Sequence, residues 1–466
     1  MQPIPTLSPF VQQVLDRYEA RSPGALALRM TLEHTFGSAE IDAIFEKTRQ
    51  LQYDRTLHFS TVVDVMAAVV TQGVPSVNAG LKALGEALPV SRTAFYNKLN
   101  ATEPAIAAAL VKHSARRARE IIEHTGGTRA PVLDGYRLKI VDGAHLGGTE
   151  RRLQVLWGCA AGPLPGMCLV ILEPDVMLAT AAIPCEDGHA QERSLTEALL
   201  KHMHPGDCLM GDRNFCTTPI LFGVAERGAA SLLREHANLP WRPIGKRKAQ
   251  GRIDTGSVYE QRIVVIGDKG AELEARRITL VLNTPTRDGD TELHLITTIP
   301  REKVSAKALA KAYSARWRIE TAFGHMASWL EAEINTLGYP RAALLAFCVG
   351  LMAYNTLSVL QGALRAVHGE QVVQEEVSSY HLVHQARADV GGLDTLLEPS
   401  DWEPIRTMTA ADLAVRLVEV VRHIPLATIR KAKRGPKKPV PKRTRFKGKP
   451  HVSTKRLLER YFQGDS

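Results

Sequence analysis

The sequence predicts a mixed α/β protein with helical segments at both ends. Three observations support this. Residues 1–125 show the apolar spacing of α-helices without strand-like alternation, short β-prone and helical patterns alternate over 136–235, and a very apolar helical pattern covers 340–364. A chain of 466 residues is long enough to bury about two to four hydrophobic cores.

The N-terminal segment, residues 1–125, is expected to be an all-α DNA-binding domain. The stretch "VNAGLKALGEALPVSRTAFYNKLN" has the outline of a helix-turn-helix, with a break at Pro89 and Ser91 as the N-cap of a second helix. A helical pair without any DNA partner fits the same pattern, so both interpretations stay open. The second helix is expected to display Arg92, Tyr96, Asn97 and Lys98.

Residues 126–235 form the first part of the predicted core. Three β-prone runs joined by tight turns indicate a meander, and a regular alternation of helix and strand follows. The expected strands of the meander are 137–142, 152–161 and 166–174. The expected later elements are a helix over 192–203, a strand over 207–212, a helix over 218–228 and a strand over 229–235.

The rest of the chain divides into four predicted segments. Residues 236–290 are expected to be a β-rich insertion with a basic loop, "WRPIGKRKAQGR", and two strands. The remaining segments are 291–365, the second part of the core, with a strand and two helices; 366–425, a helical C-terminal region; and 426–466, a basic tail.

The tail concentrates the positive charge of the protein. Residues 430–460 hold fourteen Lys and Arg against one acid, Glu459, whereas the whole chain has a net charge of +10. A segment so basic and so poor in aliphatic residues cannot bury a core, so we expect it to be disordered until a polyanion orders it. Nucleic acid is the expected partner, and a purely solubilising tail is the alternative. The basic side chains expected to contact DNA here are Lys437, Lys438, Lys442 and Arg443.

Neither a membrane nor a disulfide framework is expected. The start of the chain has no basic region followed by an apolar run, and the most apolar stretch, Ala342 to Tyr354, ends at Asn355, so we expect a cytoplasmic protein. Six cysteines are scattered without the C-x2-C spacing of a structural zinc site. The histidines of "HMH" at 202–204 and His189 also lack a convergent ligand set.

The helix predicted over "YSARWRIETAFGHMASWL" carries three polar side chains beside its apolar stripe. At about 100° per residue, Tyr313, Arg316 and Glu320 share one narrow face next to the stripe. They are therefore expected at the wall of a cleft. Taken alone, Arg316 and Glu320 could equally be an ordinary ion pair on a helix surface.

Two aspartates end predicted buried strands: Asp142 in "LKIVDGAHL" and Asp212 in "CLMGDRNF". Strand ends direct side chains into a crevice, although an aspartate before glycine is often only a turn residue. Asp134, which precedes its strand, fits the turn interpretation better.

Two strand-end aspartates and one helical glutamate form the ligand set that magnesium-dependent phosphoryl transfer requires. Hard divalent cations prefer oxygen ligands, and two ions can activate the attacking oxygen and stabilise the leaving one. We expect Asp142 to bridge two Mg²⁺ ions, for which Mn²⁺ could substitute, while Asp212 and Glu320 each complete one shell. Arg316 would orient Glu320 or bind a phosphate.

Together, "VDG", "GDRNF" and "YSARWRIE" resemble the DDE transposases of bacterial insertion sequences, in the insertion-sequence-4-like branch marked by Tyr-x2-Arg-x3-Glu. The resemblance covers roughly residues 130–360. It implies a ribonuclease H-like catalytic core with a β-rich insertion between the second aspartate and the glutamate, and it implies catalytic roles for Tyr313 and Arg316. No bound organic cofactor is expected.

The sequence departs from this branch at one position. The signature continues with a lysine seven residues after the glutamate, and here that residue is Ala327, so His325 or Arg318 would have to substitute. The family's aromatic residue in the insertion, which stacks on a flipped base, has Trp241 and Tyr259 as candidates, although ordinary packing explains either.

The resemblance implies a transposase that binds its terminal inverted repeats as a homodimer, cleaves the DNA ends and joins them to target DNA. Two alternatives stay open: a catalytically silent DNA-binding protein descended from a transposase, and a ribonuclease H-like nuclease without strand transfer. Further DNA contacts are expected from Arg213, Lys246, Arg247, Lys248 and Arg318.

Overall fold

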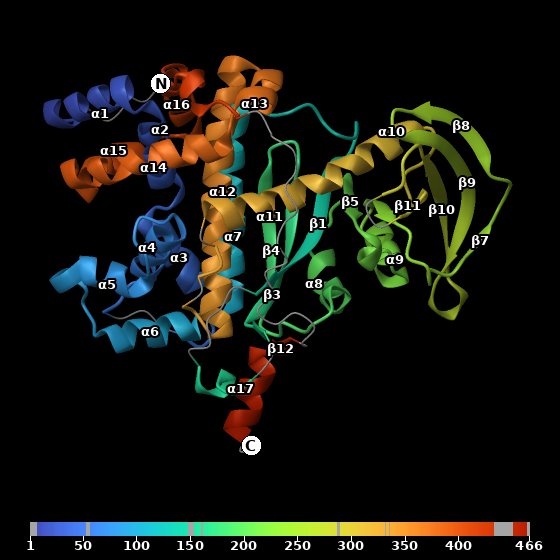
Figure 1. Cartoon of the computed structure of the whole chain (residues 1–466), viewed down its shortest axis with the longest axis horizontal. Helices are drawn as coiled ribbons and strands as arrows, with labels where there is room; N and C mark the ends of the chain where they lie inside the picture. The colour runs from blue at the N-terminus through green and yellow to red at the C-terminus, as the bar shows by residue number, and fades with distance from the viewer. Residues whose placement is uncertain are drawn as a thin grey trace.

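The computed structural model describes residues 7–52, 56–147, 153–159, 162–286, 289–330, 332–334, 336–432 and 451–463. A large mixed sheet stands between helices, so the predicted α/β class is confirmed (Figure 1). The N-terminal helices are α1 (Pro9–Arg21), α2 (Pro23–Thr35), α3 (Ser38–Thr48), α4 (Phe59–Val70), α5 (Val77–Leu84), α6 (Arg92–Ala101) and α7 (Pro104–Thr125).

Strands dominate the middle of the chain. In sequence order they are β1 (Arg137–Leu146), β2 (Pro163–Leu164), β3 (Gly166–Glu173), β4 (Leu178–Cys185), β5 (Asp207–Gly211), β6 (Ala230–Arg234), β7 (Trp241–Pro243), β8 (Lys248–Ile253), β9 (Gly256–Ile266), β10 (Glu272–Leu282), β11 (Glu292–Thr297) and, near the C-terminus, β12 (Val452–Ser453). The short helices between them are α8 (Thr196–Leu200) and α9 (Thr218–Glu226).

The second half of the chain is mostly helical. Its helices are α10 (Ala306–Ala312), α11 (Trp317–Trp329), α12 (Pro340–His368), α13 (Glu370–Glu376), α14 (Ser379–Leu396), α15 (Glu403–Arg406), α16 (Ala410–Arg422) and α17 (Thr454–Gln463). The predicted helical C-terminal region thus consists of α13 to α16.

The main sheet has the strand order β4-β3-β1-β5-β6-β11-β10-β9-β7, with β8 also paired to β9. Strand β3 is antiparallel to both of its neighbours, β4 and β1, whereas β5 runs parallel to β1 and β6 runs parallel to β5. The two parallel connections pass through α8 and α9, because parallel neighbours need a crossover. The strands β1, β5 and β6 therefore end at the same edge of the sheet.

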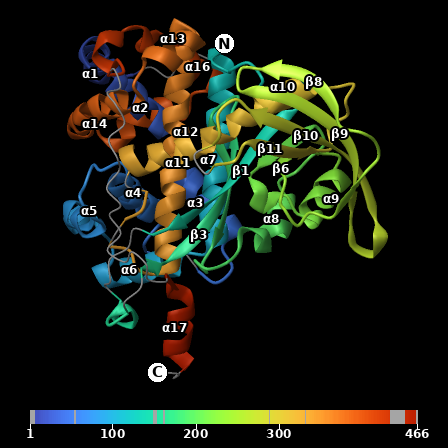
Figure 2. The ribbon, with the colours of Figure 1, turned by 45° about the vertical axis from the view of Figure 1, so that its right-hand side comes forward.

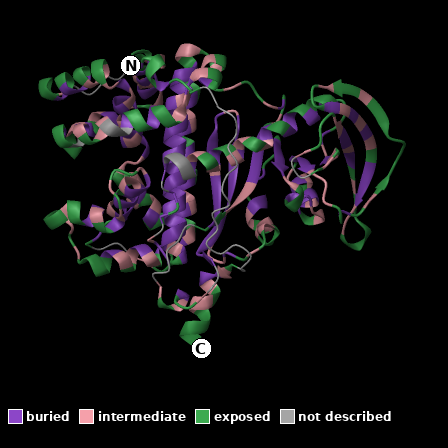
Figure 3. Ribbon diagram, in the orientation of Figure 1, coloured by how far each residue is buried: buried purple, intermediate pink, exposed green. Residues whose placement is uncertain are grey.

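Alternating side chains bury both faces of the inner strands. On β1, Leu138 and Ile140 pack into a cluster with α7 and α12, whereas Val141 packs on the opposite face with α8 and α9. The sheet is therefore covered on both sides, and its inner strands are buried over most of their length (Figure 3). The same cluster with α7 and α12 includes Phe45 and Phe95 of the N-terminal helices, so these helices and the sheet share one hydrophobic core.

The predicted insertion continues the main sheet instead of forming a separate one. Strand β11 pairs with both β6 and β10, and Figure 2 shows the outer strands as a curved extension beside α10. The prediction of a basic loop over 241–252 is wrong at its two ends, because β7 and β8 both pair with β9. Their side chains are mostly exposed, so the sequence lacks the apolar alternation that marks a strand.

The predicted meander has three strands, as expected, but one of the three is a different segment of the chain. Of the predicted strand over 152–161, the described residues 153–159 are not a strand and contain a 3₁₀ turn, Gln154–Leu156. The missing third strand is β4, which pairs with β3. Its sequence, "LATAAIPC", has no aromatic residue and only two β-branched ones, Thr180 and Ile183, so its strand signal is weak and tertiary pairing decides its conformation.

The prediction of a disordered tail is wrong for residues 451–463. Strand β12 pairs in parallel with β2, and α17 follows it directly. Arg456 of α17 forms an ion pair with Asp187, with 2.6 Å between Nη2 and Oδ2. These contacts hold the end of the chain against the core. The basic residues Lys437, Lys438, Lys442 and Arg443 lie outside the described residues.

Helix α12 is the central helix of the protein. It is the one described helix that is long and apolar enough to cross a membrane by composition, and its apolar window is entirely buried inside the protein. A core helix shows this pattern. Figure 1 shows α12 beside α7, next to the sheet.

Asn355 connects this helix to the edge strand β4. Its Oδ1 accepts a hydrogen bond from Ala179 N at 2.8 Å, and its Nδ2 donates to Ala179 O at 3.0 Å and to Ser114 Oγ at 3.1 Å. The side chain is fully buried. It therefore satisfies backbone groups that the outermost strand of the sheet would otherwise leave unpaired.

We expect Asn355→Leu to lower the free energy of unfolding by about 2–4 kcal/mol, because both polar groups of Ala179 would stay buried without partners. Ser114→Ala is the comparison, since it leaves both polar groups of Ala179 paired and removes only the acceptor of one Asn355 hydrogen bond and the bond that Ser114 Oγ donates to the Val111 carbonyl in its own helix. It should cost about 1 kcal/mol. Urea denaturation of the two variants measures the difference. Equal stability of Asn355→Leu and wild type would contradict this role.

Candidate active site

Strand β1 places Asp142 where the neighbouring strand β5 ends. The last parallel pair of these strands is Ile140 with Met210, and β5 stops one residue later, at Gly211. Asp142 and Asp212 each follow that pair by two residues. They therefore lie at the same level of the sheet on adjacent parallel strands, as predicted for side chains at strand ends.

The chain turns sharply after β5, and Asp212 caps that turn. A 3₁₀ turn, Arg213–Phe215, follows, and Asn214 N donates a hydrogen bond to Asp212 Oδ1 at 2.8 Å. Phe215 is fully buried below the turn. The local sequence thus holds the Asp212 carboxylate beside the end of the sheet.

The helical segment that carries the third acid is α10, a 3₁₀ turn over Tyr313–Arg316, and α11. Tyr313 is buried and its Oη donates to the carbonyl oxygen of Gly211 at 3.2 Å. Arg316 Nη1 lies 2.8 Å from Glu320 Oε1 and 4.0 Å from Asp142 Oδ2. The three side chains that share a face in the sequence therefore all approach the ends of β1 and β5.

Arg316 holds two carboxylates from distant parts of the chain. Its side chain is 12% exposed, and its guanidinium also lies over the ring of Trp317 at 4.5 Å. A planar guanidinium can serve two acids at once. The interpretation of Arg316 and Glu320 as an isolated surface ion pair does not describe this geometry, because Asp142 joins them.

Burial and like charge raise the pKa of Asp142. Desolvation is the largest cause, the charges of Glu192 and Asp212 add to it, and together they raise the pKa to about 7 against the opposing effects of the Gly143 N–H and Arg316. A carboxyl group perturbed in this way by burial and neighbouring acids is typical of a functional site.

Glu192 is the site residue that sequence reasoning missed. It opens the 3₁₀ turn Glu192–Leu195 before α8, and its Oε2 accepts a hydrogen bond from Asn214 Nδ2 at 3.2 Å. Burial raises its pKa, and the charge of Asp212 adds to the effect. In the sequence it is one polar residue among several at a helix start, and only the crossover from β4 brings it to the site.

The donor set fits a hard divalent cation by its chemistry, because carboxylates from β1, β5, α11 and the turn before α8 all supply oxygen ligands. The described side chains are not gathered around a single point. Among the described residues, no three His, Cys, Asp or Glu side chains are arranged to hold a metal ion directly. The cation next to Asp142 and Glu320 in this structure is Arg316.

The predicted substitutes for the missing signature lysine lie elsewhere. Arg318 is turned about 200° around α11 from Glu320, and its Nη1 donates to Pro174 O at 3.4 Å. Burial of His325 lowers the pKa of its side chain, and the charge of Lys431 adds to this effect. The pKa is about 4. The side chain of Ala327 lies outside the described part of the structure. His189 is exposed, and His145 is the histidine whose charge reaches Glu192.

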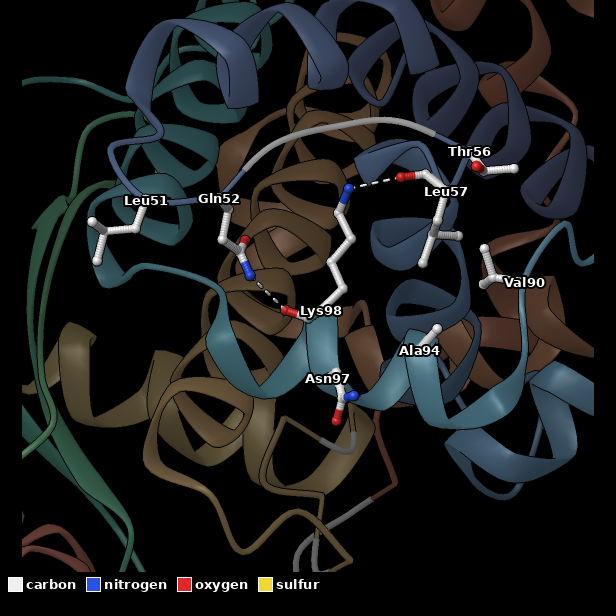
Figure 4. Close-up of a pocket in the computed structure, with 8 residues that line it drawn as sticks. All are labelled: Leu51, Gln52, Thr56, Leu57, Val90, Ala94, Asn97 and Lys98. Carbon is white, nitrogen blue, oxygen red and sulfur yellow. Dashed lines mark hydrogen bonds between the residues drawn. The ribbon is translucent and has the colours of Figure 1, made fainter.

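The predicted helix-turn-helix is present in outline. Ser91 caps α6 by accepting from Ala94 N, as expected, and Arg92 is exposed. Lys98 does not project outward as predicted: its Nζ donates to Leu57 O at 2.7 Å and lies over the Phe45 ring. Figure 4 shows Lys98 reaching across a groove of about 470 Å³ between α6 and the segment around Leu57. Tyr96 is half-buried, packed edge-on against Phe95.

The basic residues of the outer strands are exposed, as a DNA-contacting surface requires. Lys246, Arg247 and Lys248 all lie at the surface, and the Arg247 guanidinium covers the ring of Tyr259 at 4.1 Å. Trp241 Nε1 donates to Glu235 Oε1, and the Arg277 guanidinium lies over its ring. Both candidate stacking rings therefore already pack against arginines. Arg213 is exposed next to Asp212.

The fold and the site together define a mixed α/β protein with an acidic cluster at one edge of its sheet. Residues 166–356 match the family described as the transposase DDE domain. This segment of the chain is therefore similar to DDE transposases, and it contains Asp212 and Glu320 but begins after Asp142. No curated protein sequence matches the chain.

Seven chains of solved structures match this chain. One is the cryo-EM structure of the piggyBac transposase synaptic complex with hairpin DNA, with a TM-score of 0.40 and 10% sequence identity. The match covers 78% of this chain and 80% of that chain.

Proposed function

We propose that the protein is a DNA transposase that cleaves the ends of its own element and joins them to target DNA. The single observation that carries the proposal is the meeting of Asp142, Asp212 and Glu320 at one edge of the sheet, with Arg316 between two of them. The match of residues 166–356 to the transposase DDE domain supports it.

The strand arrangement supports a ribonuclease H-like core within this proposal. Three antiparallel strands, β4, β3 and β1, are followed by two parallel ones, β5 and β6, and α11 supplies the glutamate. The spacing of Tyr313, Arg316 and Glu320 supports the insertion-sequence branch named above. In this proposal the protein acts as a homodimer on terminal repeats and target DNA in a bacterial cytoplasm.

Each side chain has a defined task in the proposed reaction. Asp142, Asp212 and Glu320 would hold two Mg²⁺ ions, or Mn²⁺ in their place, which would supply charge for phosphoryl transfer to water or to a 3′ hydroxyl. Tyr313 positions the end of β5 through its hydrogen bond to Gly211, and so positions Asp212. Arg316 keeps the carboxylates of Asp142 and Glu320 together and would be available for a phosphate.

DNA contacts are proposed on three surfaces. Arg213 lies next to the site, and Arg92 lies on α6. Lys246 and Arg247 lie between β7 and β8, and Lys248 begins β8. The tail residues Lys437, Lys438, Lys442 and Arg443 would add phosphate contacts that give affinity without sequence specificity. Arg318, which faces Pro174, is the least direct of the proposed contacts.

Glu320→Gln is expected to lower Mg²⁺-dependent cleavage of DNA carrying the element's terminal repeats by about 10³-fold, equivalent to about 4 kcal/mol. The amide keeps the shape of the side chain but loses the charge that a cation requires. Gel analysis of cleaved and joined products, with and without EDTA, measures the effect. Glu197→Gln, an exposed residue of α8, is the control.

Two outcomes would contradict the proposal. Cleavage by Glu320→Gln at the wild-type rate would remove this residue from the mechanism. Cleaved ends without any joined product would indicate a nuclease of similar fold.

A further inference from the structure

Helix α10 carries two exposed lysines on adjacent turns and no acid. Lys307 and Lys311 are four residues apart, and Lys303 is exposed just before the helix begins. Like charges at this spacing on a helix repel each other. In the described part of the chain, no carboxylate forms an ion pair with any of these three lysines. Their positive charge is therefore not balanced by the described protein.

Helix α10 lies beside the outer strand β8, as Figure 2 shows. A Cβ atom at position 251 would lie 3.8 Å from Cδ and from Nζ of Lys307, so this side chain extends over β8. Lys248 of the same strand is the register partner of Glu260 in β9, and paired residues project to the same side of a sheet. Val258, two residues before Glu260, also projects to this side and packs in one hydrophobic cluster with α10. Lys248 and the lysines of α10 therefore lie on one side of the sheet.

The carboxylates at the strand ends project to this same side. Ile140 of β1 packs in the cluster that contains α10, and Asp142 follows it by two residues in the same strand. Met210 of β5 belongs to that cluster too, and Asp212 follows it by two residues with extended backbone angles. The lysines and the two aspartates are thus not separated by the sheet.

The helix fixes the distance between the lysines and the third acid. Helix α10 continues through the 3₁₀ turn Tyr313–Arg316 into α11. Lys311 precedes Glu320 by nine residues, which corresponds to roughly 14 Å along a helix axis. This is the length of about four nucleotides of one DNA strand, at 3.4 Å each.

The predicted basic loop is divided between the two sides of the sheet. The Arg247 guanidinium lies over the ring of Tyr259 and 3.7 Å from Glu292. Tyr259 alternates with Val258 in β9, so it projects to the opposite side. Lys248, and not Arg247, therefore shares the side of the acids.

We propose that Lys248, Lys303, Lys307 and Lys311, which we call the α10 surface, bind the phosphate backbone of the DNA next to the bond that is cleaved. The inference rests on the proposed function and extends it, because the three lysines of the α10 segment have no role there. Lysine binds phosphate as a point charge, so this surface gives affinity without sequence specificity. Bound phosphates also relieve the repulsion between Lys307 and Lys311.

Lysine acetylation of the full-length protein, read by mass spectrometry, tests the surface residue by residue. The probe is a duplex that carries the element's terminal repeat, in EDTA so that it stays uncut. We expect the bound duplex to slow acetylation of Lys307 and Lys311 by about fivefold or more, because phosphates cover their ammonium groups. Lys201 and Lys269 are the controls and should react as in the free protein. Lys201 follows α8, and the turn with Lys269 contacts α9, so both lie on the opposite side of the sheet.

A double variant measures what the surface contributes to binding. Lys307→Ala/Lys311→Ala removes two exposed side chains and keeps a good helix former at both positions. At about 150 mM NaCl the Kd for the same duplex is expected to rise about tenfold, and the slope of log Kd against log salt concentration to fall by about 2. Lys201→Ala/Lys269→Ala removes the same charge and should leave both values unchanged. Equal losses in the two double variants would overturn the proposal, because general charge would then explain the binding.

The outcomes separate this inference from the proposed function. Wild-type affinity in Lys307→Ala/Lys311→Ala, together with loss of cleavage in Asp212→Asn, would overturn the α10 surface and leave the proposed function intact. Weakened binding in the lysine variant, together with undiminished cleavage in Asp212→Asn, would support the α10 surface and overturn the catalytic site.

Discussion

Asp212→Asn is expected to lower Mg²⁺-dependent DNA cleavage by about 10³-fold or more while leaving the fold unchanged. The substitution removes the negative charge at the end of β5. It keeps an oxygen that can accept the hydrogen bond from Asn214 N, so the 3₁₀ turn after the strand should stay capped. Cleavage assays at saturating DNA, paired with circular dichroism, measure the two effects separately.

Asp254→Asn is the matched control for this experiment, because Asp254 is an exposed turn residue of the outer strands. It should cleave as wild type does. If Asp212→Asn retained cleavage within tenfold of wild type, the assignment of the acidic cluster as the catalytic site would be wrong.

Asp142→Asn is expected to make the metal-free protein more stable at pH 8 than wild type, by up to about 4 kcal/mol. The pKa of Asp142 is about 7 in the folded protein, mainly through burial, against an ordinary value of 3.8. The folded state therefore holds this proton more tightly than the unfolded state does. The resulting destabilisation is absent below about pH 4, grows as pH rises towards 7 and is fully present above 7.

Urea denaturation in EDTA at pH 5 and pH 8 measures this effect. The stability difference between Asp142→Asn and wild type should be larger at pH 8 than at pH 5, since the asparagine has no proton to release. A difference that is zero at pH 8, or equal at the two pH values, would show that Asp142 is not a buried, perturbed acid. Asp254→Asn is again the control.

Much of the inner sheet could be predicted because its strands follow their own local preferences. The buried runs that became β1 and β3 are rich in Val, Ile and Leu, and those that became β5 and β6 are short buried runs that each follow a predicted helix. Strand β4 was missed because alanine, proline and cysteine carry no strand signal, and pairing with β3 decides its conformation. Strand β8 was missed because an exposed edge has no apolar alternation.

Helical periodicity and the ends of predicted strands were enough to place five residues of the candidate site. Periodicity places Tyr313, Arg316 and Glu320 on one face of a helix, and β-prone runs place Asp142 and Asp212 at strand ends. That Arg316 reaches Asp142 follows from the packing of α11 near β1, which no local pattern encodes. Glu192 could not be found for the same reason, because its approach to Gly143 depends on the path of the crossover after β4.

The paired strands from β5 to β9 connect the acidic cluster to the outer part of the sheet. Strand β6 joins β5 on one side and β11 on the other, and β11 continues through β10 to β9 without interruption. Consecutive hydrogen-bonded strands therefore connect the exposed basic residues around Arg247 to the turn that carries Asp212. Under the proposed function, a duplex bound on the outer strands would therefore be held at a fixed position relative to the carboxylates at the ends of β1 and β5.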